Sequence, residues 1–372
     1  MAGPASNRCR RNSEGRGLKI LLLTRYARLG ASSRLRALQY LPHFLSLGWQ
    51  VDPAPFFSNA YLRNLYSGKP TWKEALVAYF GRIRELAHAG QYNLLWVEKE
   101  ILPFLPATAE RLLKRIGIPY LVDYDDALFH RYDLHRLSLV RGLLGQKIDA
   151  VMKNAVLVMT GNSYLAGRAR SAGAKRIEIV PTVVDLNRYP AVDDQPDDRG
   201  ESLVVGWIGT PKTSHYLCSF KRVFESLQSQ FNVRFAAVGA NRISLGDLPV
   251  APWPWSEDNE VDSIRKFDIG IMPLEDSPWE RGKCGYKLIQ YMACGLPVVA
   301  SPVGVNAEIV EVGINGFLAG DQFEWRDSLA ALLSDAESRR QMGLNGRKKV
   351  ESWYCLQTQA PRLEMLLREL FC

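Results

Sequence analysis

The feature that most constrains this chain is an alternation of short apolar runs with amphipathic helical segments, which occurs twice along the sequence. The first run, Lys19-Ile-Leu-Leu-Leu-Thr24, has an apolar interior typical of a strand buried on both faces of a parallel sheet. A single long helix is expected over 136–154. The expected strands are 19–24, 50–53, 94–97, 120–123, 156–159 and 177–180. This pattern predicts a doubly wound α/β domain.

The pattern is interrupted at residues 190–202, which are acidic, contain two prolines and lack apolar periodicity, as linkers do. It restarts at Leu203-Val-Val-Gly-Trp-Ile208 and continues through apolar runs at 233–238, 269–272, 297–300 and near 317–318. We therefore expect the following organisation: a disordered tail at 1–17, a first domain at 18–188, a linker at 189–202, a second domain at 203–355 and a final helix within 356–372.

Composition excludes several classes of protein. The six cysteines form no C-x-x-C pair and are accompanied by only five histidines, so neither a zinc site nor a disulfide framework is expected. No apolar run reaches the roughly 18 residues of a spanning helix, and the arginine-rich start lacks the apolar segment of a secretory signal. These features predict a cytoplasmic protein.

The formal net charge of +8 suits an anionic partner, such as a nucleoside diphosphate or an anionic membrane surface. No recognition helix or aromatic-rich motif accompanies the charge, so nucleic acid is not an expected partner. Common nucleotide and hydrolase motifs are also missing. Neither G-x-G-x-x-G after a strand, nor G-x-x-x-x-G-K-[ST], nor G-x-S-x-G is present. A dinucleotide dehydrogenase, a P-loop NTPase and an α/β-hydrolase are therefore disfavoured.

The most informative stretch is 270–318, which has the pattern strand, polar loop, helix, Gly-Leu-Pro turn and strand. Lys283, Lys287 and the amides at a helix start near Gly285 predict a compact site for an anion. Gln290 lies about one turn past Tyr286 and is placed to bind a ribose or sugar hydroxyl. A helix with an exposed lysine face explains the same spacing.

A second candidate loop, Gly206-Trp-Ile-Gly-Thr-Pro-Lys-Thr-Ser-His215, follows the first strand of the second domain. Ligands bind at that end of a strand in open α/β sheets. Gly209, Thr210, Lys212 and Ser214 are the expected phosphate-binding residues. A plain strand-to-helix turn, with Thr213 or Ser214 as the helix N-cap, is the alternative interpretation.

The first domain carries a related loop after its first strand, Gly30-Ala-Ser-Ser-Arg-Leu-Arg36. Gly30, Ser32, Ser33 and Arg34 are its candidate binding residues, and Arg34 with Arg36 could hold an anionic substrate group. The alternative is that the basic residues lie on a solvated helix start.

Acidic residues end two further strands of the first domain. Glu98 belongs to Glu98-Lys-Glu100, and Asp125 and Asp126 belong to Asp123-Tyr-Asp-Asp126. Both clusters are expected at the carboxyl edge of the sheet, where a carboxylate could orient a substrate hydroxyl or act as a base. The aspartates could instead pair with Arg131 or Arg136.

The second half resembles a known family. Met292-Ala-Cys-Gly-Leu-Pro-Val-Val-Ala300, with Ser301-Pro-Val-Gly304, Glu308-Ile-Val310 and Asn315-Gly-Phe-Leu318, is similar to the donor-site segment of the family-4, or group 1, retaining glycosyltransferases. The resemblance implies the GT-B fold: two facing Rossmann-like, doubly wound domains with an interdomain cleft and a last helix that crosses back to the first domain. It implies neither a metal ion nor another cofactor.

The resemblance also implies roles for individual residues. Lys212 and Lys283 would stabilise the leaving diphosphate, Gln290 would hold the ribose, and Asp125 or Asp126 would address the acceptor. This sequence departs from the family pattern, because the usual pair of glutamates falls on Gly282 and Gln290. Glu280 is the candidate for the displaced carboxylate, and the arginine that usually precedes the lysine of the second-domain loop is absent.

The implied function is transfer of a sugar from a nucleoside-diphosphate sugar to a hydroxyl of a sugar, glycan or lipid-linked acceptor, with retention, in cell-envelope polysaccharide or glycolipid synthesis. The basic first half is compatible with peripheral contact to the inner face of the plasma membrane. A non-hydrolysing sugar-nucleotide epimerase and a non-catalytic nucleotide-sugar-binding member of the family are the alternatives. The sequence does not select the base, the sugar, the acceptor or the oligomeric state.

Overall fold

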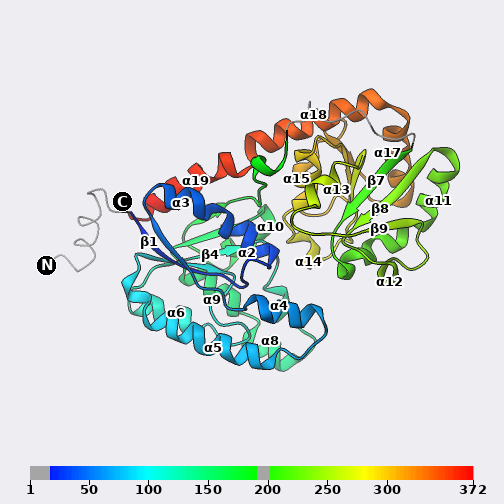
Figure 1. The fold of residues 1–372 in the computed structure, drawn as a ribbon. Coiled ribbons are helices and arrows are strands. Elements are labelled where there is room, and N and C mark those ends of the chain that lie inside the picture. Colours follow the sequence, from blue (N-terminus) through cyan, green and yellow to red (C-terminus); the bar gives the residue numbers. More distant parts are fainter. Residues whose placement is uncertain (1–16, 191–201, 372) are drawn as a thin grey trace. The chain divides into compact units, whose positions relative to one another are not determined.

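The computed structural model describes residues 17–190 and 202–371 (Figure 1). The chain divides into two compact units, Met1–Thr182 with Gln359–Cys372, and Val183–Thr358. The first boundary falls after Thr182, where the sequence suggested 188, and the last residues of the chain belong to the first unit from Gln359 onwards. The expected tail at 1–17 and the expected linker at 189–202 lie almost wholly outside the described residues.

The first unit is built on a six-stranded parallel sheet of order β2-β1-β3-β4-β5-β6. The strands are β1 Lys19–Leu23, β2 Gln50–Pro53, β3 Leu94–Glu98, β4 Tyr120–Tyr124, β5 Leu157–Thr160 and β6 Ile177–Ile179. All six expected strands are present. Every residue of β3, β4 and β5 is buried, as expected for strands covered on both faces.

Helices fill the connections of this unit. They are α2 Ala31–Arg36, α3 Leu41–Ser46, α4 Asn59–Tyr66, α5 Trp72–Ala87, α6 Thr108–Arg115, α7 His130–Asp133, α8 Ser138–Leu144, α9 Lys147–Asn154 and α10 Ser163–Ser171. The single helix expected over 136–154 is two helices, because α8 ends at Leu144 and the chain turns at Gly145. At Gly145 a Cβ would lie 2.4 Å from the carbonyl oxygen of Arg141, so the turn requires glycine.

The second unit has a parallel sheet of order β12-β11-β10-β7-β8-β9. Its strands are β7 Leu203–Ile208, β8 Val233–Val238, β9 Val250–Trp253, β10 Ile269–Met272, β11 Val298–Ala300 and β12 Gly316–Leu318. The sequence did not predict β9. It contains Pro252 and is largely exposed, both of which suit an edge strand and weaken the sequence signal.

The helices of this unit are α11 Lys221–Gln230, α12 Arg242–Leu245, α13 Glu260–Ile264, α14 Pro278–Arg281, α15 Tyr286–Ala293, α16 Asn306–Ile309, α17 Gln322–Ser334 and α18 Ala336–Trp353. A 3-10 helix, Pro211–Phe220, precedes α11, where the sequence suggested one helix over 214–229. The last helix, α19 Leu356–Glu369, passes from the second unit into the first. Within the described residues, no helix is both long and apolar enough to cross a bilayer.

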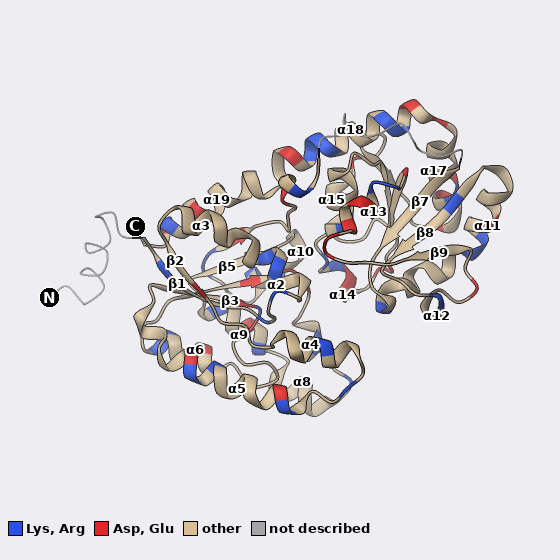
Figure 2. Cartoon of the chain, in the orientation of Figure 1, with Lys and Arg blue, Asp and Glu red and all other residues tan. Residues whose placement is uncertain are grey.

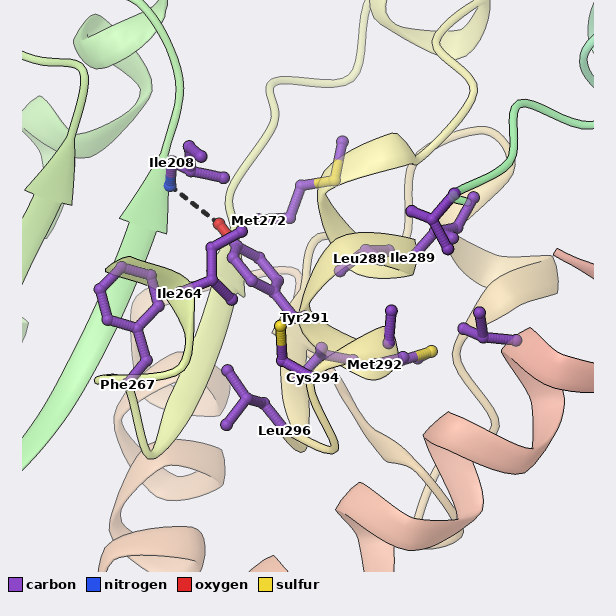
Figure 3. Packing of buried hydrophobic residues seen from close by; sticks show 14 of the residues in the cluster. Ile208, Ile264, Phe267, Met272, Leu288, Ile289, Tyr291, Met292, Cys294 and Leu296 are labelled. Atoms are coloured by element: carbon purple, nitrogen blue, oxygen red, sulfur yellow. Dashed lines mark hydrogen bonds between the residues drawn. The ribbon is translucent and has the colours of Figure 1, made fainter. Parts of the chain in front are cut away.

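Tyr291 fixes α15 against the sheet of the second unit (Figure 3). Its buried hydroxyl accepts a hydrogen bond from the Ile208 amide at 2.9 Å and donates one to the Ile271 carbonyl at 3.2 Å. Leu288, Ile289 and Met292 pack in the same core and are fully buried. Fully burying each such side chain contributes about 1.5–3 kcal/mol. Helix α15 is thereby held against the carboxyl ends of β7 and β10.

Candidate functional site

The carboxyl edge of the first unit's sheet gathers the polar residues that follow β1, β3 and β4. Glu98, the last residue of β3, is buried and accepts hydrogen bonds from the Ser33 hydroxyl at 2.5 Å and the Arg25 amide at 2.8 Å. Ser32 lies 2.9 Å from Glu98 and 2.6 Å from Asp125. Because a hydroxyl donates only one proton, Ser32 serves one of the two carboxylates at a time. The structure thus brings Ser32, Glu98 and Asp125 together, as the sequence suggested.

Lys99 is a member of this polar group that sequence analysis missed. Its ammonium lies 2.8 Å from a carboxylate oxygen of Asp125 and 2.8 Å from one of Asp126. The Lys99 backbone has a φ of 68°, in the left-handed region that side-chain-bearing residues rarely adopt. The cation that contacts both aspartates is therefore Lys99, rather than Arg131 or Arg136. The sequence signal that could have indicated Lys99 is its position between two glutamates directly after a strand.

The environment drives the pKa values of Glu98 and Asp125 apart. Burial raises the pKa of Glu98, with only partial compensation from Lys99. Burial also opposes ionisation of Asp125, but the adjacent Lys99 ammonium and the Ser32 hydroxyl outweigh it and lower the pKa. Neighbouring carboxyl groups with diverging pKa values are typical of acid–base sites. Asp125 is thus a stable anion at neutral pH.

Arg36 and Arg34 are buried, so the solvated helix start suggested for them is wrong. Arg36 binds Asp123 through Nε at 3.0 Å and donates to the Val180 carbonyl at 2.7 Å. It neutralises the aspartate at the end of β4 and supports the sheet edge. Figure 2 shows the blue of α2 beside red segments at the ends of the central strands. Arg34 donates to the Arg28 carbonyl at 3.4 Å. Gly30 is the N-cap of α2, and a Cβ there would lie against Tyr26.

A second group of polar residues lies before α15 in the second unit. Lys283 donates to the Tyr216 hydroxyl at 2.9 Å, and Tyr216 donates to Glu280 at 2.6 Å. Ser277 also donates to Glu280. Burial opposes ionisation of Glu280, but the bonds from Ser277 and Tyr216 and the charge of Lys283 lower its pKa. Glu280 therefore anchors Tyr216 and Lys283. Sequence analysis missed Tyr216, which lies in a helical stretch without a recognisable motif.

Lys287 is the least compensated charge of this group. Its ammonium lies 4.2 Å from the centre of the buried Trp207 ring, a cation–π contact. Burial and the neighbouring charge of Lys283 lower the pKa of Lys287 to about 7. In the part of the chain that the structure describes, no carboxylate forms an ion pair with it. A lysine in this state gains most from an incoming anion.

The loop after β7 differs in part from its predicted role. Thr210 is the N-cap of the 3-10 helix, where Thr213 or Ser214 was suggested. Ser214 is buried, and its hydroxyl lies 2.8 Å from the Pro211 carbonyl and 3.1 Å from the Ser244 carbonyl, donating to one of them at a time. Its contact with phosphate stays a prediction. Lys212 is exposed on this loop. At Gly209 a Cβ would lie 2.2 Å from the Trp207 ring, which explains the glycine.

Gly285 and Gln290 complete the predicted set. Gly285 precedes α15 with a φ of +64°, and a Cβ there would lie 2.3 Å from Ile309. Both facts require glycine at this turn. Gln290 is buried, and its amide donates to the Tyr189 hydroxyl at 3.1 Å. A ribose contact by Gln290 would need that bond to open. Among the described residues, no group of three or more His, Cys, Asp or Glu side chains could hold a metal ion.

Comparisons with known proteins fit this architecture. The structure of HepE of Anabaena in complex with UDP has a TM-score of 0.67 and 17% identity to this chain. The match covers 95% of this chain and 100% of HepE. Sucrose-phosphate synthase of Thermosynechococcus elongatus has a TM-score of 0.67 at 18% identity, over 95% of this chain and 99% of its own. These structures define the class: a GT-B fold of two Rossmann-like domains.

Sequence comparison finds similarity to one family of glycosyltransferases. Residues 202–335 match the model described as Glycosyl transferases group 1. TuaH of Bacillus subtilis, a glycosyltransferase assigned to teichuronic acid biosynthesis, is 25% identical over 64% of this chain and 69% of its own. A D-inositol 3-phosphate glycosyltransferase of an Arthrobacter strain is 22% identical over 79% of this chain and 75% of its own. The second unit of this chain therefore matches the group 1 glycosyltransferases.

Proposed function

We propose that the chain transfers a sugar from a nucleoside-diphosphate sugar to an acceptor hydroxyl, with retention of configuration and without a metal ion or other cofactor. The acceptor is a sugar, glycan or lipid-linked intermediate of cell-envelope polysaccharide or glycolipid synthesis, used on the cytoplasmic side. The names of TuaH and of the D-inositol 3-phosphate glycosyltransferases support such acceptors. HepE, which has been determined with UDP and with UDP-glucose, supports a nucleotide-sugar donor.

The observation that carries this proposal is the pair Lys283 and Lys287 at the start of α15. Lys283 is held by Tyr216, whereas Lys287 contacts the Trp207 ring and forms no ion pair with a carboxylate of the described residues. Burial and, to a smaller extent, repulsion from the charge of Lys283 lower the pKa of Lys287. A bound diphosphate would remove the repulsion, with help from the amides at the helix start. The second unit is the proposed donor-binding unit.

In the transfer step the bond from the anomeric carbon to the diphosphate breaks, a bond to the acceptor oxygen forms, and the proton of the acceptor hydroxyl passes to the departing diphosphate. Negative charge develops on the leaving diphosphate. Lys283, Lys287 and the exposed Lys212 stabilise it, which replaces the role of a metal ion. In the first unit, the anionic Asp125 accepts a hydrogen bond from the acceptor hydroxyl and orients it. Glu280 positions Lys283 through the Tyr216 hydroxyl, and Glu98 positions Ser32 beside Asp125.

Thermal unfolding with UDP, GDP, ADP and TDP and their sugar conjugates, in the presence of EDTA, tests donor binding. A ligand at 100 times its Kd stabilises the native state by about 2.7 kcal/mol. We expect stabilisation by one diphosphate and its loss in Lys283→Ala. The matched control Lys266→Ala removes an exposed lysine of the same unit and should retain it. No stabilisation by any diphosphate contradicts the proposal.

Turnover separates the alternatives. We expect release of the nucleotide to depend on a suitable acceptor. A new nucleotide sugar formed without any acceptor would identify an epimerase. Donor binding with no release of nucleotide under any acceptor would identify a non-catalytic member, which the glycine at position 282 and the buried Gln290 would then explain.

A further inference from the structure

Helix α5 of the first unit exposes a continuous set of large apolar side chains. Trp72, Leu76, Val77, Phe80 and Ile83 are all exposed, with exposed fractions of 73% for Phe80 and 71% for Val77. Contiguous exposed apolar surface is uncommon in monomeric proteins and marks an interaction surface. None of these residues belongs to the polar groups described above.

Helical spacing collects these residues on one side of α5. At 3.6 residues per turn, the five apolar residues fall within roughly 140° of the helix circumference, together with Lys73 and Arg84. This set of seven residues is called the α5 face below. The acidic residues of the helix, Glu74 and Glu85, fall outside it. The α5 face is therefore apolar and cationic, with no acidic residue.

The opposite side of α5 is fixed to the body of the first unit. The Tyr79 hydroxyl donates to the Pro103 carbonyl at 2.5 Å, and buried Arg82 donates to the Thr24 carbonyl at 2.9 Å. Glu74 accepts a hydrogen bond from Asn64 of α4 at 2.8 Å. The α5 face is consequently held outward by the fold, rather than exposed because the helix is loose.

Neighbouring segments extend the same kind of surface. Leu65 and Tyr66 at the end of α4, and Phe104 and Leu105 directly after Pro103, are exposed. Lys69 lies exposed between α4 and α5. Figure 1 shows α4 and α5 at the lower edge of the first unit. The bonds from Tyr79 to Pro103 and from Asn64 to Glu74 tie these segments to α5.

We propose that the α5 face binds the surface of an anionic lipid bilayer. Trp72, Phe80 and the aliphatic residues would enter the boundary between headgroups and acyl chains, with α5 parallel to the membrane plane. Lys69, Lys73 and Arg84 would contact lipid phosphates, each contributing through the negative surface potential. Their long apolar stems allow the charged ends to stay among the headgroups.

The charge pattern favours a membrane over a second copy of the chain. In a two-fold dimer the same face meets itself, so Lys73 and Arg84 of one copy would approach those of the other with no acidic residue between them. An anionic membrane supplies the missing negative charge. The inference stands apart from the transfer reaction, because lipid binding is measured without donor or acceptor.

Flotation of the full chain with lipid vesicles tests the inference. We expect binding to vesicles of phosphatidylglycerol with phosphatidylcholine, little binding to phosphatidylcholine alone, and weaker binding at high salt. The double variant Trp72→Ser/Phe80→Ser should lower the partition coefficient at least tenfold. Phe323→Ser, which removes a phenylalanine of similar exposure from α17 in the second unit, should not. Lys69→Glu/Lys73→Glu should also abolish binding.

Three results would overturn it. The first is no binding of the wild-type chain to anionic vesicles. The second is equal binding by the wild type and the double variant, which would assign lipid binding elsewhere, for example to the arginines before residue 17. The third is a dimer in sedimentation equilibrium that the double variant dissociates. Circular dichroism and thermal unfolding of each variant show whether it is folded, and diphosphate binding by the second unit should be unchanged.

Discussion

The ammonium of Lys287 lies 4.2 Å from the centre of the Trp207 ring and has a second lysine, Lys283, as its charged neighbour. Because the pKa of Lys287 falls to about 7, much of it is neutral at pH 8 in the free protein. A bound diphosphate favours the protonated form and raises that pKa. Binding should therefore take up a proton above pH 7 and weaken as the pH rises towards 9.

Calorimetric titration in buffers of different ionisation enthalpy measures this proton uptake. We expect an uptake approaching one proton per diphosphate near pH 8.5, and none in Lys287→Met. Lys266→Met serves as the control, since it removes an exposed lysine of the same unit and should keep the wild-type uptake. Equal proton uptake by wild type and Lys287→Met would contradict the assignment.

Lys99→Met should destabilise the first unit and change its pH dependence. Removing one partner of a buried ion pair costs about 3–5 kcal/mol, because Asp125 and Asp126 would lose the cation that contacts both. The pKa of Asp125 is depressed in the folded state, so its contribution to stability is present above its ordinary pKa and is lost as the pH falls through the folded value. Lys99→Met should abolish that contribution. It should also shift the acid limb of the activity profile to higher pH, because Asp125 would then be protonated at a higher pH.

Urea unfolding between pH 3 and 8 measures the stability effect, and the pH profile of kcat/KM measures the catalytic effect. Lys153→Met, at an exposed position of α9, is the control and should change neither. An unchanged acid limb in Lys99→Met would show that Asp125 does not address the acceptor.

Ser32 and Ser33 are adjacent but should respond differently to substitution. Ser33 accepts from the Tyr26 amide at 2.9 Å and donates to Glu98, so Ser33→Ala leaves buried groups unpaired and should cost about 1–3 kcal/mol. Ser32 is less buried and connects Glu98 with Asp125. Ser32→Ala should leave stability within about 1 kcal/mol and lower kcat roughly tenfold. Unfolding curves and initial rates distinguish the two; a larger stability loss in Ser32→Ala would reverse the assignment.

Local sequence patterns were sufficient for most of the fold. The strands of the first unit are apolar runs because both of their faces are covered, and such runs are recognisable without knowing their neighbours. β9 was missed since an edge strand is half solvated, and Pro252 further weakens its signal. The break in the helix expected over 136–154 was missed because a single glycine is a weak signal inside an apolar periodic segment.

The candidate site was less predictable, because its contacts join residues far apart in sequence. Ser32 and Asp125 are separated by 93 positions, and Lys283 and Tyr216 by 67. Sequence spacing placed these residues near strand ends. It could not show which side chains form hydrogen bonds or ion pairs with one another. Ser214 illustrates the limit: its type suits phosphate binding, yet the turn buries it against two carbonyls.

Tyr291→Phe tests how α15 is held in the second unit. The substitution keeps the ring that packs in the core of Figure 3 but removes the hydroxyl that bridges the Ile208 amide and the Ile271 carbonyl. Two buried backbone groups would lose their partner, so we expect a loss of about 1–3 kcal/mol in the free energy of unfolding. Because the hydroxyl sets the position of α15 relative to β7, diphosphate affinity should also fall several-fold. Denaturant unfolding and calorimetry measure the two effects. Tyr66→Phe, at an exposed position of α4, should alter neither, and unchanged stability in Tyr291→Phe would show that α15 is held by packing alone.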